Sequence, residues 1–116
     1  MGDIPSWFGA PLADRDGVSV GAVCDVYFDQ ASSRPAWLLV DLMRPGGYAL
    51  VPVAGAVSWR GMVMVPFERE HVRASPAIEP SATLCTDALL RLARHYGVRA
   101  DRSAAYAAVH GAARAA

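Results

Sequence analysis

Apolar and polar side chains alternate along residues 18–29 of the chain. One parity is apolar throughout: Val18, Val20, Ala22, Cys24, Val26 and Phe28. The other parity is mostly polar: Ser19, Gly21, Asp25 and Asp29, with Val23 and Tyr27 among them. A period of two is that of a β-strand, so the pattern predicts a strand whose apolar set faces a core. Cys24 belongs to that set and is expected to be a buried, inert thiol.

The neighbouring segments predict more strands around this one. A polar, Pro-containing break over residues 30–35 precedes the apolar run 37–42, so the two strands are expected to pair as antiparallel neighbours. Residues 9–13 predict a short first strand and residues 48–53 a further long one. Between the first two strands, Asp-Arg-Asp-Gly at 14–17 favours a turn. A calcium loop also begins with Asp-x-Asp-Gly, but its later oxygen ligands are replaced here by an apolar strand.

Residues 57–65 have the pattern of a compact hairpin. Arg60-Gly61 forms a two-residue turn between short apolar runs. This register places Trp59 opposite Met62 and Val57 opposite Met64 on one face, with Val63 and Val65 on the other. Both faces are therefore apolar. Because one core covers only one face, a second cover is expected: the following helix, the tail, or another copy of the chain.

The remainder of the chain predicts one helix and little else. Residues 84–96 have an apolar stripe at helical spacing: Leu89, Leu92, Ala93 and Tyr96. Cys85 or Thr86 is expected to cap its N-terminus and Gly97 its C-terminus, where His95 also favours the helix end. The stretch 67–80 is expected to be irregular. The chain is therefore predicted to have four parts. Residues 1–8 are a lead-in with Trp7 and Phe8 as an aromatic anchor, and residues 9–80 form a barrel. Residues 81–99 form a helical region packed on the barrel, and residues 100–116 are an Ala-rich tail that is helical or disordered. In a helix, Tyr106, Val109 and Ala113 share one side.

Composition narrows the class of protein. A hydrophobic fraction of 53% with 19% charged residues favours a packed domain, and the net charge of zero argues against nucleic acid as a partner. All eleven cationic residues are Arg, a bias typical of a GC-rich bacterial genome. No apolar run approaches the roughly 20 residues that a spanning helix needs. No signal-peptide pattern is present, and a cytoplasmic protein is expected.

The residues that commonly perform chemistry do not form a recognisable set. Glu68, Glu70 and His71 invite a catalytic or metal-binding interpretation, but neighbours on an extended segment point to opposite sides and no second ligand cluster follows. Cys24 and Cys85 lack a paired spacing, so a disulfide between them stays possible without being inferable. No nucleophile with a matched base and no Gly-rich phosphate loop is found. We expect no enzyme activity, no cofactor and no metal.

The order of these segments resembles the PRC-barrel family, which includes the cytoplasmic part of the photosynthetic reaction centre H subunit and a domain of the ribosome maturation factor RimM. Six segments between about residues 9 and 97 carry the resemblance: Asp16-Gly17 with residues 20–26, then 35–40, 50–53, 63–67, 72–76 and 94–97. The tail beyond Ala100 falls outside it.

The resemblance implies a fold and a general role. The fold is mainly β, a small closed antiparallel barrel of about six strands followed by a C-terminal helix. The role is that of a non-enzymatic interaction module that associates with itself and docks an unidentified protein partner. Two alternatives also follow from the family: an RNA- or ribosome-associated accessory module, and a protein associated with reaction-centre electron transfer or redox sensing. For self-association, the sequence predicts a homodimer interface formed by Val57, Trp59, Met62 and Met64.

Overall fold

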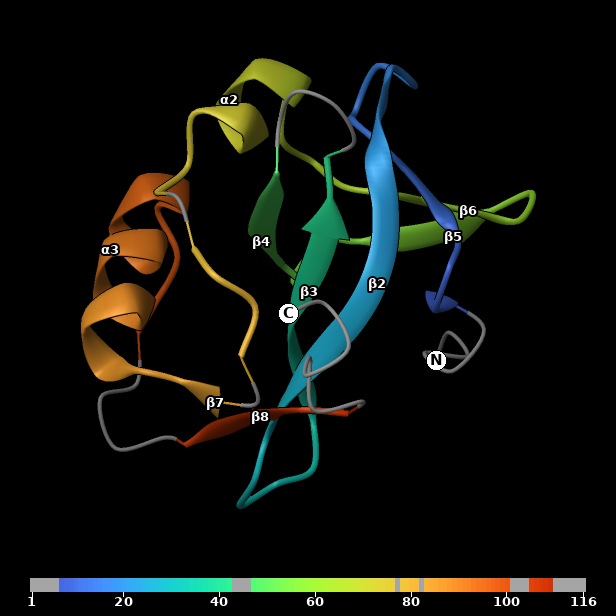
Figure 1. Cartoon of the computed structure of the whole chain (residues 1–116). Coiled ribbons are helices and arrows are strands. Elements are labelled where there is room, and N and C mark those ends of the chain that lie inside the picture. The colour runs from blue at the N-terminus through green and yellow to red at the C-terminus, as the bar shows by residue number, and fades with distance from the viewer. Residues whose placement is uncertain (1–6, 43–46, 77, 82, 101–104, 110–116) are drawn as a thin grey trace.

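The strand β2 (Ser19–Asp29) is the longest element and the centre of one mixed sheet. A computed structural model describes residues 7–42, 47–76, 78–81, 83–100 and 105–109. The hydrogen-bonded strand order is β4-β3-β2-β1-β6-β5, and β8 pairs with both β2 and β7. The remaining strands are β1 (Pro11–Ala13), β3 (Pro35–Asp41), β4 (Tyr48–Pro52), β5 (Val57–Trp59), β6 (Met62–Met64), β7 (Thr83–Leu84) and β8 (Tyr106–Ala108). Figure 1 shows α2 (Arg69–Arg73) and α3 (Thr86–Tyr96) on one side of this sheet and the β5–β6 hairpin on the other.

The sheet differs from the expected barrel in two respects. The hydrogen-bonded order of the described strands does not return to its start, so the closed antiparallel barrel of the sequence-based expectation is not shown. One ladder is parallel, with Leu12 of β1 beside Val63 of β6, because the chain reaches β6 only after the hairpin has reversed its direction. The short strands β7 and β8 were not predicted, and the helix α3 is followed by β8 rather than closing the fold.

Bulges in β2 overturn the simple alternation predicted for that strand. Val20 has no partner in the ladder with β1, and Cys24 has none in the ladder with β3. Each extra residue shifts the side that the following residues face. Val23 and Tyr27, expected toward solvent, are therefore buried, whereas Cys24 is exposed rather than buried.

Gly21 stands beside the first bulge, next to Val20, which has no partner in the ladder with β1. A Cβ atom there would overlap with the backbone carbonyl oxygen of Asp41 and would lie 3.1 Å from a methyl group of Val40. The absence of a side chain therefore lets β2 and β3 approach each other closely where the strand bends.

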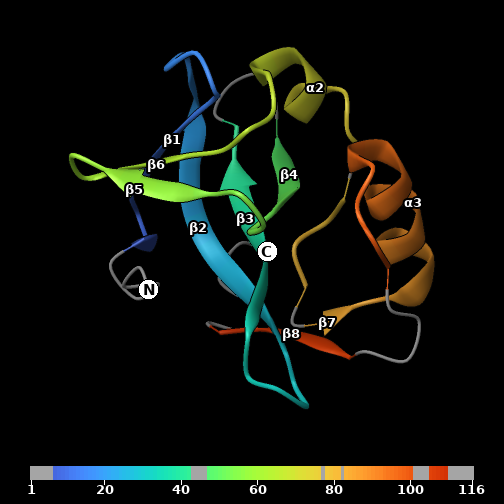
Figure 2. The same cartoon turned by 180° about the vertical axis from the view of Figure 1, so that it is seen from behind.

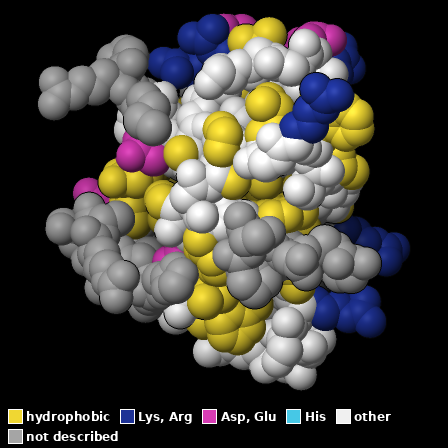
Figure 3. All heavy atoms as spheres, turned by 90° about the vertical axis from the view of Figure 1, so that its right-hand side faces the viewer, with side chains coloured by type: hydrophobic (Ala, Val, Ile, Leu, Met, Phe, Trp, Pro, Cys, Tyr) yellow, Lys and Arg dark blue, Asp and Glu magenta, His cyan; other side chains and the backbone are white. Residues whose placement is uncertain are grey.

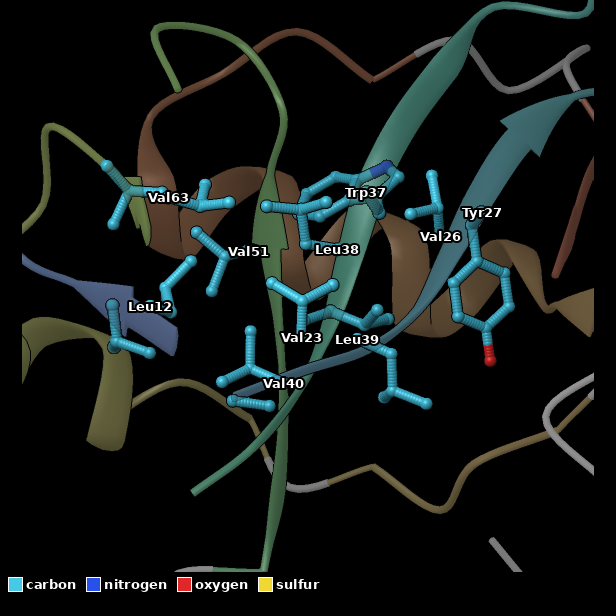
Figure 4. Packing of buried hydrophobic residues seen from close by; sticks show 14 of the residues in the cluster. Leu12, Val23, Val26, Tyr27, Trp37, Leu38, Leu39, Val40, Val51 and Val63 are labelled. Carbon is cyan, nitrogen blue, oxygen red and sulfur yellow. The ribbon is translucent and has the colours of Figure 1, made fainter. Parts of the chain in front are cut away.

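The core is formed mainly by β2, β3 and β4. Residues 37–40 of the apolar run 37–42 are all buried, so β3 is covered on both faces. Figure 4 shows their side chains meeting those of Leu12, Val51 and Val63 from three other strands. The predicted burial of Trp37 is confirmed at 3% exposure, and Trp7 of the lead-in is also buried.

The helix α3 has the ends and the buried stripe that the sequence predicted. Cys85 is its N-cap residue, and Gly97 ends it at φ 69°. Its four predicted apolar positions are its four buried ones, Leu89, Leu92, Ala93 and Tyr96. Tyr96 contacts Trp37, with ring centroids 6.2 Å apart, so the helix packs on the β3 side of the core.

Two parts of the chain have structure that the sequence analysis missed. The stretch expected to be irregular contains α2, whose N-cap residue Glu68 makes no side-chain cap. The carboxylate of Asp14 caps it instead, because Oδ2 accepts the N–H of Arg69 while Oδ1 accepts those of Asp16 and Val18. The turn predicted at residues 14–17 is thus also an anchor for a distant helix.

The tail was predicted to be helical or disordered, and over residues 106–108 it is neither. These residues form β8, whose pairing with β2 and β7 draws the C-terminal region into the sheet. Val109 is exposed, and Ala113 lies outside the described residues. The intrinsic preference of Ala is for helix, so the pairing of this short segment with β2 and β7 overrides its local propensity.

Candidate interaction site

The β5–β6 hairpin has the register that the sequence predicted. Val57 pairs with Met64, Ser58 with Val63, and Trp59 with Met62. The connecting residues Arg60 and Gly61 have φ angles of 50° and 81°. Two successive positive φ values are those of a type I′ turn, whose twist matches that of two-residue hairpins. The turn therefore fixes which side chains share a face.

The two faces of the hairpin have opposite environments. Val63 and Val65 are buried at 1% and 2% exposure and join the core. On the other face, Val57 is 55% exposed and Trp59 is 57% exposed. Met62 and Met64 lie beside them and are half-buried. We call Val57, Trp59, Met62 and Met64 the hairpin patch. The prediction that both faces are apolar is confirmed, and only one of them is covered.

One cation lies at the tip of the hairpin patch. The guanidinium carbon of Arg60 is 5.3 Å from the centroid of the Trp59 ring. At that distance the cation is attracted by the negative face of the ring, an interaction of about 0.5–1 kcal/mol at an exposed site. Arg60 therefore holds the indole in place at the surface without hiding it from solvent.

The hairpin patch lies far from the helices. Figures 1 and 2 show the hairpin projecting from one side of the molecule while α2 and α3 occupy the opposite side. The strand β5 pairs only with β6 among the described strands and is an edge of the sheet. Figure 3 views the side that carries the hairpin and shows hydrophobic side chains distributed across it. Of the three covers expected from sequence, α3 is therefore ruled out, because it lies across the molecule.

The charged residues singled out from the sequence do not converge on one site. The Oε2 atom of Glu68 pairs with Nη2 of Arg15 at 2.9 Å on the surface. His71 instead turns toward α3, where its Nε2 atom lies 2.9 Å from the backbone oxygen of His95. In the part of the chain that the structure describes, no three or more His, Cys, Asp or Glu residues are grouped as a metal site requires.

The two cysteines are separate and free. Cys24 is exposed, but its Sγ atom lies 3.4 Å from the backbone oxygen of Leu39, to which the thiol donates. Partial burial of the sulfur, with the charges of Asp41 and Asp25, raises the pKa of Cys24 to about 11. The thiolate form is therefore scarce at neutral pH.

A cavity of about 320 Å³ was missed by the sequence analysis. It lies between the start of α3 and the segment 78–84, and Cys85 and Arg91 line it. Tyr27 forms part of it and donates a hydrogen bond of 2.5 Å to the backbone oxygen of Ser81. No sequence signal marks this cavity, because its residues come from a strand, a loop and a helix that only the fold brings together.

Comparison with known proteins identifies the family of this chain. No curated protein sequence matches the chain. No helix in the described residues is long and apolar enough to cross a membrane. The family model for the PRC-barrel domain matches residues 3–72, a span that includes the strands β1 to β6 and nearly all of α2. Since this match covers more than half of the sequence and the predicted segments occur in the same order, the chain belongs to the PRC-barrel domain family.

Proposed function

We propose that this chain is a non-enzymatic interaction module that forms an isologous homodimer through the hairpin patch and docks further protein partners. The exposure of Trp59, at 57%, is the observation that carries the proposal. A large aromatic side chain loses favourable burial energy when it stays in water. Trp and Met are also enriched where proteins meet.

A second copy of the chain is the occupant that the hairpin patch fits best. Its four side chains are all apolar, and Arg60 is the one charged residue within the hairpin. An isologous interface brings the same patch from both protomers together, so an uncharged apolar face is complementary to itself. Residues 110–116 are the competing cover within the chain, since α3 and β8 are both committed elsewhere in the fold.

The two alternatives from the family have less support. A net charge of zero gives an RNA backbone no general attraction. A redox-sensing thiol needs a populated thiolate, whereas the pKa of Cys24 is raised to about 11. Both observations favour a protein-binding module over either alternative.

Light scattering on purified protein tests the dimer. We expect twice the chain mass for the parent and a single chain mass for Trp59→Arg/Met62→Glu. The matched control is Val18→Glu, because Val18 is another exposed apolar residue, at 43% exposure, but lies outside the hairpin. The control should keep the parent mass.

A chain that ends at Val109 separates the two possible covers. Its mass should equal that of the parent if a second copy occupies the hairpin patch. A parent that is monomeric, together with a truncated chain that associates, would show that the tail covers the patch instead. A double variant with an unchanged dimer mass would place the interface elsewhere.

A further inference from the structure

His71 and His95 form a reciprocal pair that joins α2 to α3. Their rings are stacked, with centroids 4.1 Å apart and planes 11° from parallel. The Nε2 atom of His71 lies 2.9 Å from the backbone oxygen of His95, and the Nε2 atom of His95 lies 2.7 Å from the backbone oxygen of His71. Each imidazole therefore binds the backbone of the residue that carries the other.

This arrangement determines where the ring hydrogens are. A carbonyl oxygen only accepts, so both Nε2 atoms must donate, and in a neutral ring the Nδ1 atom then has no hydrogen. Both carbonyls belong to the last turn of a helix, where intrahelical donors run out. Each histidine thus caps the C-terminal end of the other's helix. The sequence predicted that His95 favours a helix C-terminus, but the helix that it caps is α2.

The pair is continuous with the core through aromatic contacts. The ring of Tyr96 lies edge-on to both imidazoles, with centroids 5.6 Å from His71 and 5.0 Å from His95. Tyr96 in turn contacts Phe67 at 4.8 Å and Trp37 at 6.2 Å. A change in the histidine pair therefore acts directly on the residue through which α3 packs against β3.

The charged residues on α2, α3 and their flanks include more Arg than acidic residues. The side chain of His71 is exposed and that of His95 is half-buried, so water and protons reach both. Glu68, the N-cap residue of α2, is paired with Arg15. Glu70 is the acidic residue within α2, and Asp87 is at the far end of α3. The charged groups on the two helices and their flanks are Glu68, Arg69, Glu70, Arg73, Asp87, Arg91, Arg94 and Arg99.

We propose that His71 and His95 are a pH-sensitive latch that holds α3 against α2 while at most one of the two rings is charged. A single imidazolium keeps its Nε2–H donor, and a cation is favoured at a helix C-terminus. A second proton places two like charges in rings whose centroids are 4.1 Å apart, and their mutual repulsion disfavours the stack. The stack then separates and α3 loses its attachment to α2.

The sign of the pH dependence follows from counting protons. The released state binds two protons independently, whereas the latched state binds the first and resists the second. The first proton does not favour release, whereas the second does, so release is favoured toward the acid end of the range of about 5 to 8 in which imidazoles change charge. Carboxylates such as Asp14 contribute only at lower pH, since the pKa of that group lies below its ordinary value of 3.8. This latch is independent of the hairpin patch, which lies on the other side of the molecule.

Hydrogen exchange of the α3 amides tests the latch in the full chain. After correction for the intrinsic pH dependence of exchange, the opening constant of α3 should be about tenfold higher at pH 5 than at pH 8, because the second proton binds more readily once the stacked rings are apart. The amides of β3, which is buried on both faces, should show no such rise.

His71→Gln and His95→Gln are the decisive variants. Glutamine keeps an N–H donor at the end of its side chain but does not titrate. Each variant should open α3 more readily than the parent at pH 8, because the stack is lost, yet show no further increase toward pH 5. Arg94→Gln, which changes a charge on α3 outside the pair, should keep the acid-dependent rise. Variants that retain the full rise would overturn the proposal.

A titration of the parent protein gives a test that needs no variant. The ring C–H resonances of the two histidines, followed by NMR, should shift in two separated steps, because the second proton is resisted by the first. Coincident, independent titrations of both rings would contradict the latch whatever the variants do.

Discussion

Trp37 and Trp59 are both strand tryptophans with apolar neighbours, yet their surroundings are opposite. Trp37 in β3 is 3% exposed and Trp59 in β5 is 57% exposed. The strand β3 has β2 on one side and β4 on the other, whereas β5 ends the sheet and pairs only with β6. Trp37 is also covered by Tyr96 from α3, whereas Trp59 lies beside Met62 of the hairpin patch and the guanidinium of Arg60.

The difference shows that position in the sheet decides what an apolar strand residue contributes. In the centre, apolar side chains are buried by neighbouring strands and stabilise the folded chain. At the hairpin, the same residue type stays in water and is available to a partner. The following predictions separate these two contributions.

The largest expected effect comes from the central tryptophan. Trp37→Ala should lower the free energy of unfolding by about 3–5 kcal/mol, because it removes buried surface and leaves a cavity beneath Tyr96. Trp59→Ala should lower it by less than about 1 kcal/mol. Chemical denaturation of both variants in a common Met62→Glu background, which retains Trp59 and alters the hairpin patch, measures both. Equal losses would remove the distinction between centre and hairpin.

Two glycines, one in the centre of the sheet and one in the hairpin, should differ in the same way in how much stability a substitution costs. Gly21→Ala should cost about 3 kcal/mol, since its Cβ would overlap with the Asp41 carbonyl and force β2 away from β3. Gly61→Ala meets open space, and its cost should be only about 1–2 kcal/mol, from an alanine held at φ 81°. The denaturation midpoints of the two variants measure this difference in stability. A Gly21→Ala protein as stable as the parent would mean that β2 and β3 separate easily.

Asp14, in the turn before β2, is expected to make the stability of the protein depend on pH. Burial alone would raise the pKa of Asp14, but the N–H groups of Val18, Arg69 and Asp16, with the charge of Arg15, outweigh it and lower that pKa. A lowered folded-state pKa stabilises the protein above about pH 4 and ceases to do so as pH falls through it. Asp14→Asn should therefore reduce the Tm at pH 7 and lessen its decline in acid. Parallel Tm curves for parent and variant would contradict this assignment.

The smallest effect concerns the reactivity of the two thiols and leaves stability unchanged. Cys24 should react slowly with iodoacetamide at pH 7.5, because its pKa is raised to about 11, whereas the exposed Cys85 at the start of α3 should react first. Mass spectrometry of peptides from briefly alkylated native protein gives the order. Faster labelling of Cys24 would restore the redox-sensing alternative.

Local patterns in the sequence determined several elements of this protein. The two-residue turn at Arg60-Gly61 sets the hairpin register, and four residues at helical spacing define the buried stripe of α3. Both features depend on neighbours along the chain, so periodicity and turn chemistry are sufficient to predict them. The hairpin patch was predicted in the same way, from a segment with more apolar residues than one core can cover.

Contacts between segments that are distant in the sequence determined the other features of the fold. The bulges that expose Cys24 and bury Tyr27 arise where β2 must match β1 and β3 at once. Asp14 caps α2 from 55 residues away, and His71 meets His95 across 24 residues. None of these pairings produces a periodic pattern in the sequence, because each depends on which surfaces the sheet brings together. The open, mixed strand order has the same origin, since the parallel pairing of β1 with β6 forms only after the hairpin has folded back.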